Sequence, residues 1–265
     1  MRAALERLID YAGLFPPAKL PLDDALVQYE RAREGDASWM LARFIVPAEK
    51  LIELRNCLEG RARIELSVIA APTMFEVVGR ARHEGWATIA GIEVPLGDYS
   101  IGGCARQARR ARLDDLPIYV ELSGVRMAMD ELAEGRLGAK LRCGGVKPSA
   151  YPSVEAVAAF IAGASAAGVP FKATAGLHHP LRHFNSEAGV MMHGFLNLVA
   201  AAVHAPHVDR QTLERIVAAE HLDELDLKDE DEVRLARRKR FVSFGSCSFD
   251  EPVDDLRALH LLGGR

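Results

Sequence analysis

The sequence predicts a single-domain α/β protein, folded over residues 1–265 as a (β/α)8 TIM barrel with an insertion in the last βα unit. Three observations support this prediction. The 265 residues are close to the roughly 250 that are typical of one such barrel. Apolar residues make up 49% of the chain, which is enough for a full core. Short apolar or β-branched runs alternate with longer stretches of helical periodicity, the pattern of βα units around a parallel sheet.

Eight short runs are predicted as the strands of this barrel, because each is rich in apolar or β-branched residues and is followed by a helical stretch or turn residues. In chain order they are Leu8–Leu14, Trp39–Val46, Arg63–Ala70, Thr88–Val94, Pro117–Leu122, Gly138–Cys143, Pro170–Ala175 and Phe241–Gly245.

The predicted helices between these strands are recognised from their first turns. The stretch Leu22–Glu34 begins with acidic residues, which suit the positive end of the helix dipole, and Pro72–Glu84 opens with proline. Ser153–Ala167 begins with a Ser-x-Glu sequence before an alanine-rich apolar stripe. Residues 244–262 end in a proline-opened amphipathic helix that is expected to close the barrel.

An unusually long segment separates the seventh predicted strand from Phe241, and it must hold the insertion. It contains the apolar sequence GFLNLVAAAVHA and the charged run from residue 223 to residue 240. The apolar sequence is either the eighth strand or a buried helix, and its length favours the helix.

Composition limits the classes of partner. A net charge of -4 excludes the broadly basic surface of a nucleic-acid binder, and the local basic cluster of residues 106–112 is interpreted as a solvated helix face. The four cysteines lack C-x-x-C spacing and the first residues lack a long apolar signal region, which favours the cytoplasm. No run approaches the roughly 18 apolar residues of a membrane span. A homodimer is expected, because closed symmetric dimers are the commonest oligomers.

Alternation along the predicted strands places many charged side chains on one face of the sheet. In AKLRCGG, Lys140 and Arg142 share a side, and in PFKATAG, Lys172 and Thr174 do. The other residues assigned to this inward face are Arg43, Glu65, Glu93, Tyr119, Glu121 and Ser123. Burying an unpaired charge costs several kcal/mol, so barrel interiors normally hold Val, Ile and Leu. Salt bridges that merely fill space are the alternative, but the position near the C-terminal ends of the strands favours an active site.

The two lysines indicate the chemistry. A lysine among apolar walls and near another cation has a lowered pKa, and its neutral amine can attack a carbonyl to form a Schiff base. Lys140, Arg142 and Lys172 fit that description on adjacent strands. One lysine is predicted as the nucleophile and the other as its neighbour, with Glu93 or Glu121 as proton shuttle.

The order of these motifs resembles deoxyribose-phosphate aldolase and the wider class I aldolase barrels. LIDYAGLFPPAKLPLDDAL looks like the first strand and loop of that family, and FVSFGSCSF like its last strand with a Gly-Ser-rich phosphate loop. Lys140 in AKLRCGG looks like the Schiff-base lysine of the sixth strand, Lys172 in FKATAGL like the second lysine on the seventh, and Glu93 in GIEVPL like the acid of the fourth. The resemblance implies an aldolase that needs no cofactor.

Three features depart from the pattern of that family: Arg142, the sequence GLHHPLRH after the second lysine, and the insertion. They leave open a separate family whose marks are KLRCGG, FKATAGLHHP and FGSCSFDEP.

Two glycine-containing loops are candidates for holding a substrate anion on backbone N–H groups. They are CGGVKPS, with Gly144 and Gly145, and GSCS, with Gly245, Ser246 and Ser248. A tight turn is the alternative explanation for each glycine. Arg142 and Lys147 would suit a substrate carboxylate equally well. The remaining residues predicted to contact substrate are Arg43, Thr174 and His179.

A histidine cluster supplies the main competing interpretation. His178, His179 and His183 follow the seventh strand, and with Glu93 or Glu121 they could bind Zn²⁺ or Mn²⁺. His178 is otherwise a candidate general acid or base, and His193 is expected to be buried.

The predicted function is therefore a carbon–carbon lyase of the aldolase type. Its substrate is a small carbonyl compound bearing a phosphate or carboxylate. The alternatives are a metal-dependent lyase or hydrolase that uses the histidine cluster, and a barrel that binds a small anion without turnover.

Overall fold

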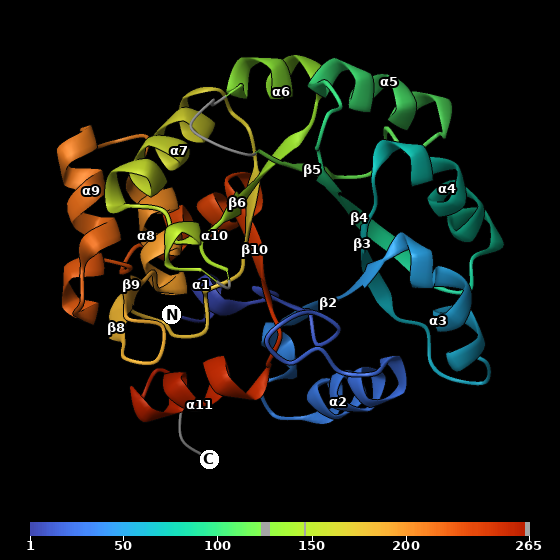
Figure 1. The fold of residues 1–265 in the computed structure, drawn as a ribbon. Helices are drawn as coiled ribbons and strands as arrows, with labels where there is room; N and C mark the ends of the chain where they lie inside the picture. The colour runs from blue at the N-terminus through green and yellow to red at the C-terminus, as the bar shows by residue number, and fades with distance from the viewer. Residues whose placement is uncertain (123–127, 146, 263–265) are drawn as a thin grey trace.

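Parallel strands close into an eight-stranded barrel in the computed structural model, which describes residues 1–122, 128–145 and 147–262 (Figure 1). Around the barrel the order is β1–β10–β7–β6–β5–β4–β3–β2. The bounds are β1 Ile9–Tyr11, β2 Leu41–Pro47, β3 Glu65–Ile69, β4 Thr88–Pro95, β5 Ile118–Glu121, β6 Gly138–Arg142, β7 Phe171–Thr174 and β10 Phe241–Ser246. Each of the eight predicted strand segments overlaps one barrel strand, so the predicted fold class is confirmed.

Helices surround the barrel and join consecutive strands (Figure 1). They are α1 Arg2–Leu5, α2 Leu22–Glu34, α3 Leu51–Cys57, α4 Phe75–Glu84, α5 Ile101–Arg110, α6 Met129–Gly135, α7 Val154–Ala166, α8 Phe195–His204, α9 Arg210–Ala218, α10 Glu230–Lys239 and α11 Asp250–Ala258. The predicted Ser153–Ala167 helix is α7, and the Ser153 side chain accepts a hydrogen bond from the Ala156 amide as its N-cap. The predicted Pro72 start is a 3-10 turn, Pro72–Met74, that leads into α4.

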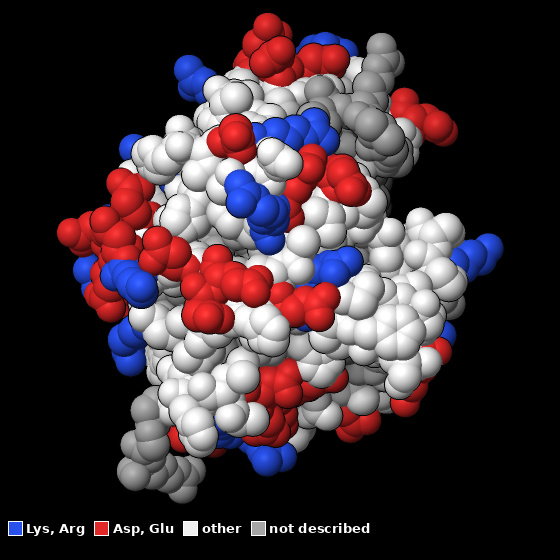
Figure 2. All heavy atoms as spheres, turned by 90° about the vertical axis from the view of Figure 1, so that its left-hand side faces the viewer, with Lys and Arg blue, Asp and Glu red and all other residues white. Residues whose placement is uncertain are grey.

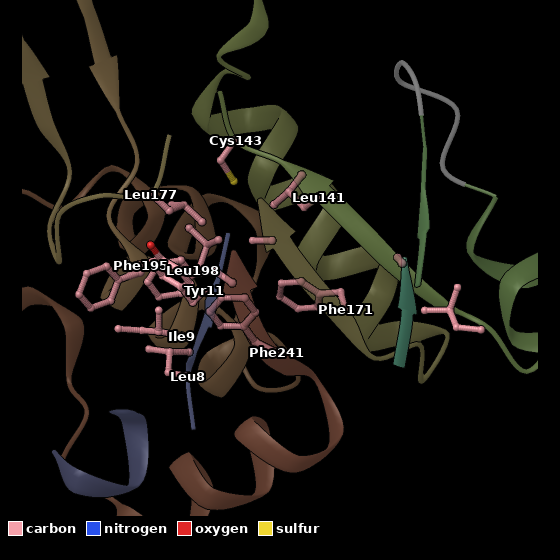
Figure 3. Close-up of a cluster of buried hydrophobic side chains, with 14 of the residues drawn as sticks. Leu8, Ile9, Tyr11, Leu141, Cys143, Phe171, Leu177, Phe195, Leu198 and Phe241 are labelled. Carbon is pink, nitrogen blue, oxygen red and sulfur yellow. The ribbon is translucent and has the colours of Figure 1, made fainter. Parts of the chain in front are cut away.

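The outward faces of the strands form the main apolar core with the helices. Phe171 of β7 packs edge-on against Phe160 of α7 and stacks on Phe241 of β10, with ring centroids 5.5 and 5.0 Å away. Phe195 of α8 stacks on Phe244 at 5.0 Å. Figure 3 shows Leu141 and Phe171 in one cluster of buried hydrophobic side chains with Phe195 and Leu198 of α8. The apolar positions of β6 and β7 therefore face the helices, which leaves their charged positions for the barrel interior.

The insertion lies between β7 and β10. It contains an antiparallel pair of strands, β8 His183–Asn185 and β9 Val190–Met192, followed by α8, α9 and α10. GFLNLVAAAVHA is the helix α8, as expected, and every residue from Phe195 to Val203 is buried. A helix that is apolar all round must be covered on all sides. The buried Asn197 ties α8 to α9 by donating to the carbonyl oxygens of Ile216 and Ala219 at 2.9 and 2.8 Å.

A buried arginine of α10 links the strand starts at the N-terminal end of the barrel. The Arg237 guanidinium donates to the carbonyl oxygens of Phe241, of Val242 at 2.6 Å and of Glu6 at 3.2 Å. Burial lowers the pKa of Arg237 to about 9. The group is still charged at neutral pH, so it joins the strand starts through charge-assisted hydrogen bonds.

None of the helices in the described part of the chain combines the length and the apolar character needed to cross a bilayer.

Candidate active site

A connected set of charged and polar side chains occupies the barrel interior. Lys172, which is 1% exposed, lies at its centre. Its Nζ contacts Asp10 Oδ2 at 2.7 Å and Ser67 Oγ at 3.0 Å, and it also pairs with Glu93 Oε1. The ring of Tyr119 has its centroid 5.6 Å from the same nitrogen. A fully buried ammonium thus has two carboxylates and a hydroxyl around it, which offsets the cost of removing it from water.

Glu93 joins the two lysines. Its Oε1 binds Lys172 and accepts from Ser67 Oγ at 2.7 Å, while its Oε2 lies 2.9 Å from Lys140 Nζ. Lys140 also pairs with Glu121 Oε2 at 3.0 Å. The two lysines are therefore separated by an acid, whereas strand alternation alone predicts them as adjacent cations.

The network reaches toward solvent through Glu121 and Arg142. The Arg142 Nε donates to Glu121 Oε1 at 2.8 Å. Exposure of the side chains increases along this path, from 1% for Lys172 to 6% for Lys140, 19% for Glu121 and 49% for Arg142. Arg142 ends β6, so the accessible end of the network lies at the C-terminal ends of the strands, where barrel enzymes carry their sites.

The two glutamates are held as carboxylates. Burial on its own would raise the pKa of Glu93, but the positive charges of Lys140 and Lys172 outweigh it and hold that pKa well below its usual range. For Glu121, burial is likewise outweighed by Lys140 and Arg142, and its pKa is lowered. Both acids are therefore ionised at neutral pH and present negative charge to Lys140 Nζ.

Strand register explains why these side chains meet. Lys140 of β6 is level with Glu121 of β5 on one side and with Lys172 of β7 on the other. Side chains at the same level of neighbouring parallel strands point to the same face. The structure thus brings together Glu93, Glu121, Lys140, Lys172 and Arg142, which alternation placed on one face.

The network has members that the sequence pattern did not assign to it. Asp10 of β1 is fully buried and binds Lys172, the Arg43 amide at 3.0 Å and Ser243 Oγ at 2.5 Å. Ser67 of β3 is another. Asp10 stands between two buried apolar residues of its strand, so the alternation that identified the lysines also carried a signal for it.

Arg43 lies in the network, because its Nη1 is 3.4 Å from Asp10 Oδ1. Thr174 ends β7 beside Arg142, and its Oγ1 is 3.5 Å from the point where Gly245 would carry a Cβ. Glu65 lies elsewhere, at the start of β3, where it pairs with Arg7 at 2.6 Å. Ser123 is outside the described residues.

The glycines of CGGVKPS have a packing reason. A Cβ on Gly144 would come within 2.9 Å of the Gly176 Cα and 2.8 Å of the Tyr151 ring, and one on Gly145 within 2.8 Å of the Ala150 Cβ. The loop after β6 thus packs directly on the backbone after β7. This close approach accounts for the glycines without a bound anion.

The GSCS loop leads into an acidic helix. Ser246 Oγ donates to the Ser248 carbonyl oxygen at 2.6 Å, and Ser248 Oγ accepts from the Glu251 amide at 3.1 Å. Asp250 and Glu251 occupy the first turn of α11. Their charges offset the positive end of the helix dipole, which makes this helix start a poor place for a phosphate.

The histidines after β7 pair with α11. His178 Nδ1 lies 2.8 Å from Glu251 Oε2, and His179 Nδ1 is bonded to Asp255 Oδ2. The ring of His183 packs edge-on against that of His179, with centroids 4.2 Å apart.

Figure 2 shows the face where α9 lies in Figure 1, with acidic side chains spread across its middle. Within residues 1–122, 128–145 and 147–262, no group of three or more His, Cys, Asp or Glu side chains is arranged to hold a metal ion.

The fold and this network define a (β/α)8 barrel with a buried ionic cluster that opens at the C-terminal ends of its strands, a fold that commonly carries enzymes. A scan against protein-family models finds no match, and a search of curated proteins finds no significant relative.

Proposed function

We propose that this chain is a lyase of the aldolase type, which makes or breaks a carbon–carbon bond in a small carbonyl substrate through an imine on Lys140. The position of Lys140 Nζ carries the proposal. It lies 2.9 Å from Glu93 and 3.0 Å from Glu121, on the inward face and one step nearer to solvent than Lys172. Of the two lysines, Lys140 is the one whose paired acid, Glu121, leads to the exposed end of the network at Arg142, and this favours its amine as the one that meets a carbonyl carbon.

Imine formation keeps the charge at this nitrogen. The lysine ammonium and a carbonyl compound yield a protonated imine and one water molecule, with Glu121 taking a proton from Nζ before attack and returning it to the departing oxygen. Because the iminium carries the same positive charge at the same atom, Glu93 and Glu121 stabilise it as they stabilise the ammonium.

The iminium then accepts electrons from the bond that breaks. A base removes the proton of the substrate β-hydroxyl, the bond between the α and β carbons breaks, and an aldehyde leaves while a neutral enamine remains on Lys140. The same proton returns to the enamine carbon, and water hydrolyses the iminium to release the second carbonyl product and the lysine ammonium. Glu121 is the acid or base best placed for these transfers, because it contacts Lys140 and is more exposed than Glu93.

Arg142 is the proposed anchor for the substrate anion. Its Nε donates to Glu121, and its two Nη groups donate no hydrogen bond to any residue that the structure describes. The free edge formed by the two Nη groups suits the paired oxygens of a carboxylate or phosphate. The acids at the start of α11 favour this anchor over the GSCS loop.

Borohydride trapping tests the proposal directly. Metal-stripped protein is incubated with a panel of small aldehydes and keto acids, reduced, and measured by intact mass and peptide mapping. The expected result is an adduct on Lys140 that Lys140→Met abolishes. Lys50→Met is the matched control, because Lys50 is an exposed lysine that pairs with Glu53 at 3.3 Å.

Other outcomes point to the alternatives. An adduct on Lys172 alone assigns the imine to the deeper lysine. No adduct, with turnover that returns only on addition of Zn²⁺ or Mn²⁺, favours metal-dependent chemistry at His178, His179 and His183. Tight binding of a carbonyl compound without adduct or turnover favours a barrel that only binds anions.

A further inference from the structure

A cavity lies at the opposite end of the barrel from Arg142. It has a volume of about 350 Å³, within the range of small-molecule sites. Its lining comes from the starts of β1, β2 and β3 and from α2 with the turn after it. The lining residues are Arg7, Tyr29, Arg33, Ser38, Trp39, Leu41, Ala42, Arg63 and Glu65.

The charges of this lining do not balance. Three arginines face one acid, Glu65, and Arg7 already pairs with it at 2.6 Å. Arg33 and Arg63 form no ion pair with any residue that the structure describes. Two guanidinium charges are therefore left for an external anion, and Arg2, over the Trp39 ring at 4.5 Å, adds another nearby.

The backbone holds Arg7 on the rim of the cavity in an uncommon conformation. Its φ of 48° lies in the left-handed region, which is unfavourable for a non-glycine residue. Its amide donates to the Trp39 carbonyl oxygen at 2.9 Å, and its own carbonyl oxygen accepts from Arg237 at 3.4 Å. Such conformations persist where the surroundings fix them, often at ligand sites.

We infer that this cavity binds a small phosphate monoester through Arg7, Arg33 and Arg63. A phosphate monoester carries a charge of about -1.5 to -2 at neutral pH, which matches the two unbalanced guanidinium charges. A phosphate monoester has three terminal oxygens that can accept paired hydrogen bonds from several guanidinium groups, whereas a carboxylate has two such oxygens and a chloride ion cannot accept a bidentate pair. This site is independent of the Lys140 chemistry.

The cavity shares its strands with the interior network. β1, β2 and β3 begin at the cavity and carry Asp10, Arg43 and Ser67 further along. A ligand at the strand starts is therefore connected by short stretches of rigid backbone to the groups around Lys172.

Fluorescence of Trp39 provides the test. The chain has two tryptophans, so Trp86→Phe leaves Trp39 as the only one. This protein is titrated with inorganic phosphate against sodium chloride of matched ionic strength. We expect a saturable change in emission, and a dissociation constant raised at least about 10-fold by Arg33→Gln or by Arg63→Gln, equivalent to about 1.4 kcal/mol for each arginine. Phosphorus-31 line broadening on the unmodified protein repeats the titration without the Trp86 substitution.

Two further variants distinguish phosphate binding in the cavity from nonspecific attraction of phosphate to positive charge on the protein surface. Arg106→Gln removes the same charge from an exposed position of α5, which does not line the cavity, and should change the dissociation constant less than about 2-fold. Ser38→Leu fills the cavity but keeps every charge, and should weaken binding as the arginine variants do. The proposal is overturned if phosphate gives no saturable signal in either readout, or if Arg106→Gln weakens binding as much as Arg33→Gln does.

Discussion

The Nζ atoms of Lys140 and Lys172 bind different oxygens of one carboxylate, that of Glu93. Each lysine has a second acid on its far side, Glu121 for Lys140 and Asp10 for Lys172. Acids and bases thus alternate from the buried Asp10 to the exposed Arg142 at the C-terminal ends of the strands. Each charge from Asp10 to Glu121 lies between two opposite charges, so loss of one of them leaves its neighbours buried with a partner missing.

Glu93→Gln is expected to destabilise the fold strongly. The substitution keeps the shape but leaves two buried ammonium groups without the acid between them, and removal of one partner of a buried pair costs about 3–5 kcal/mol. Urea unfolding at neutral pH measures the loss. Glu53→Gln removes an acid from an exposed pair with Lys50 and should cost under about 1 kcal/mol. Equal stability of the two variants would contradict this account of Glu93.

Lys172→Met should destabilise the protein more than Lys140→Met does. Removing Lys172 leaves the fully buried Asp10 with only the longer contact to Arg43 at 3.4 Å, and it leaves Glu93 with Lys140. Removing Lys140 leaves Glu93 with Lys172, and Glu121 with Arg142. Urea midpoints of the two variants, compared at pH 7, give the order. The reverse order would mean that the deep part of the network stabilises less than its accessible part.

Much of this network follows from alternation along the strands, and the part that does not has a physical explanation. Period 2 in the sequences of β5, β6 and β7 predicts Glu121, Lys140 and Lys172 on one face, because successive side chains of a strand must point to opposite sides. Period 2 does not specify which members of a face lie at the same depth. It therefore groups Glu65 with Glu93, although Glu65 lies at the strand starts.

Other contacts depend on packing that no local pattern encodes. Arg237 belongs to a charged helical run, and its place under the barrel depends on how α10 docks against residues more than two hundred positions away. The role of Gly144 depends in the same way on the approach of Gly176 from another loop. Local patterns are thus sufficient for the fold class and the two lysines, whereas contacts between distant segments follow only from the assembled barrel.

Arg142→Gln is expected to raise the pKa of Glu121. Arg142 contributes to the lowering of that pKa through a hydrogen bond and its charge, and the neutral amide supplies no charge. The carboxylate would then bind protons at higher pH than in the unmodified protein. A carbon-13 NMR titration of the Glu121 carboxyl measures the change. An unchanged midpoint would mean that Lys140 alone sets the ionisation of this acid.

Gly144→Ala should cost about 1–3 kcal/mol, because its Cβ meets the backbone of Gly176 and the Tyr151 ring at less than 3 Å and the loops after β6 and β7 must separate. Gly35→Ala is the matched control. The nearest atoms to a Cβ at Gly35 are 3.6 Å away, an ordinary contact. Thermal unfolding of both variants, with and without phosphate, separates packing from anion binding. A loss seen only in the presence of phosphate would assign Gly144 to an anion site.

Two histidines with buried ring nitrogens should make the fold sensitive to mild acid. His183 donates from Nδ1 to the Leu181 carbonyl oxygen at 3.1 Å, and His193 from Nε2 to the Pro152 carbonyl oxygen at 2.8 Å. Within the described residues, the other ring nitrogen of each is buried without a partner. Protonation would add a buried N–H with nothing to accept it, and burial accordingly lowers the pKa of both histidines below 6.5.

The sign of the pH effect follows from where the protons bind. Near pH 6.5 and below, these histidines take up protons in the unfolded chain before they do in the folded one. The free energy of unfolding is therefore fully retained above that pH and decreases as the pH falls toward the lowered values of the folded state. Urea unfolding at pH 7.5, 6.5 and 5.5 should show this decrease, and it should be smaller in His183→Gln/His193→Gln. His221→Gln, at an exposed position, should retain the full dependence. If the double variant loses stability between pH 7.5 and 5.5 as steeply as the unmodified protein does, other groups are responsible for the acid sensitivity.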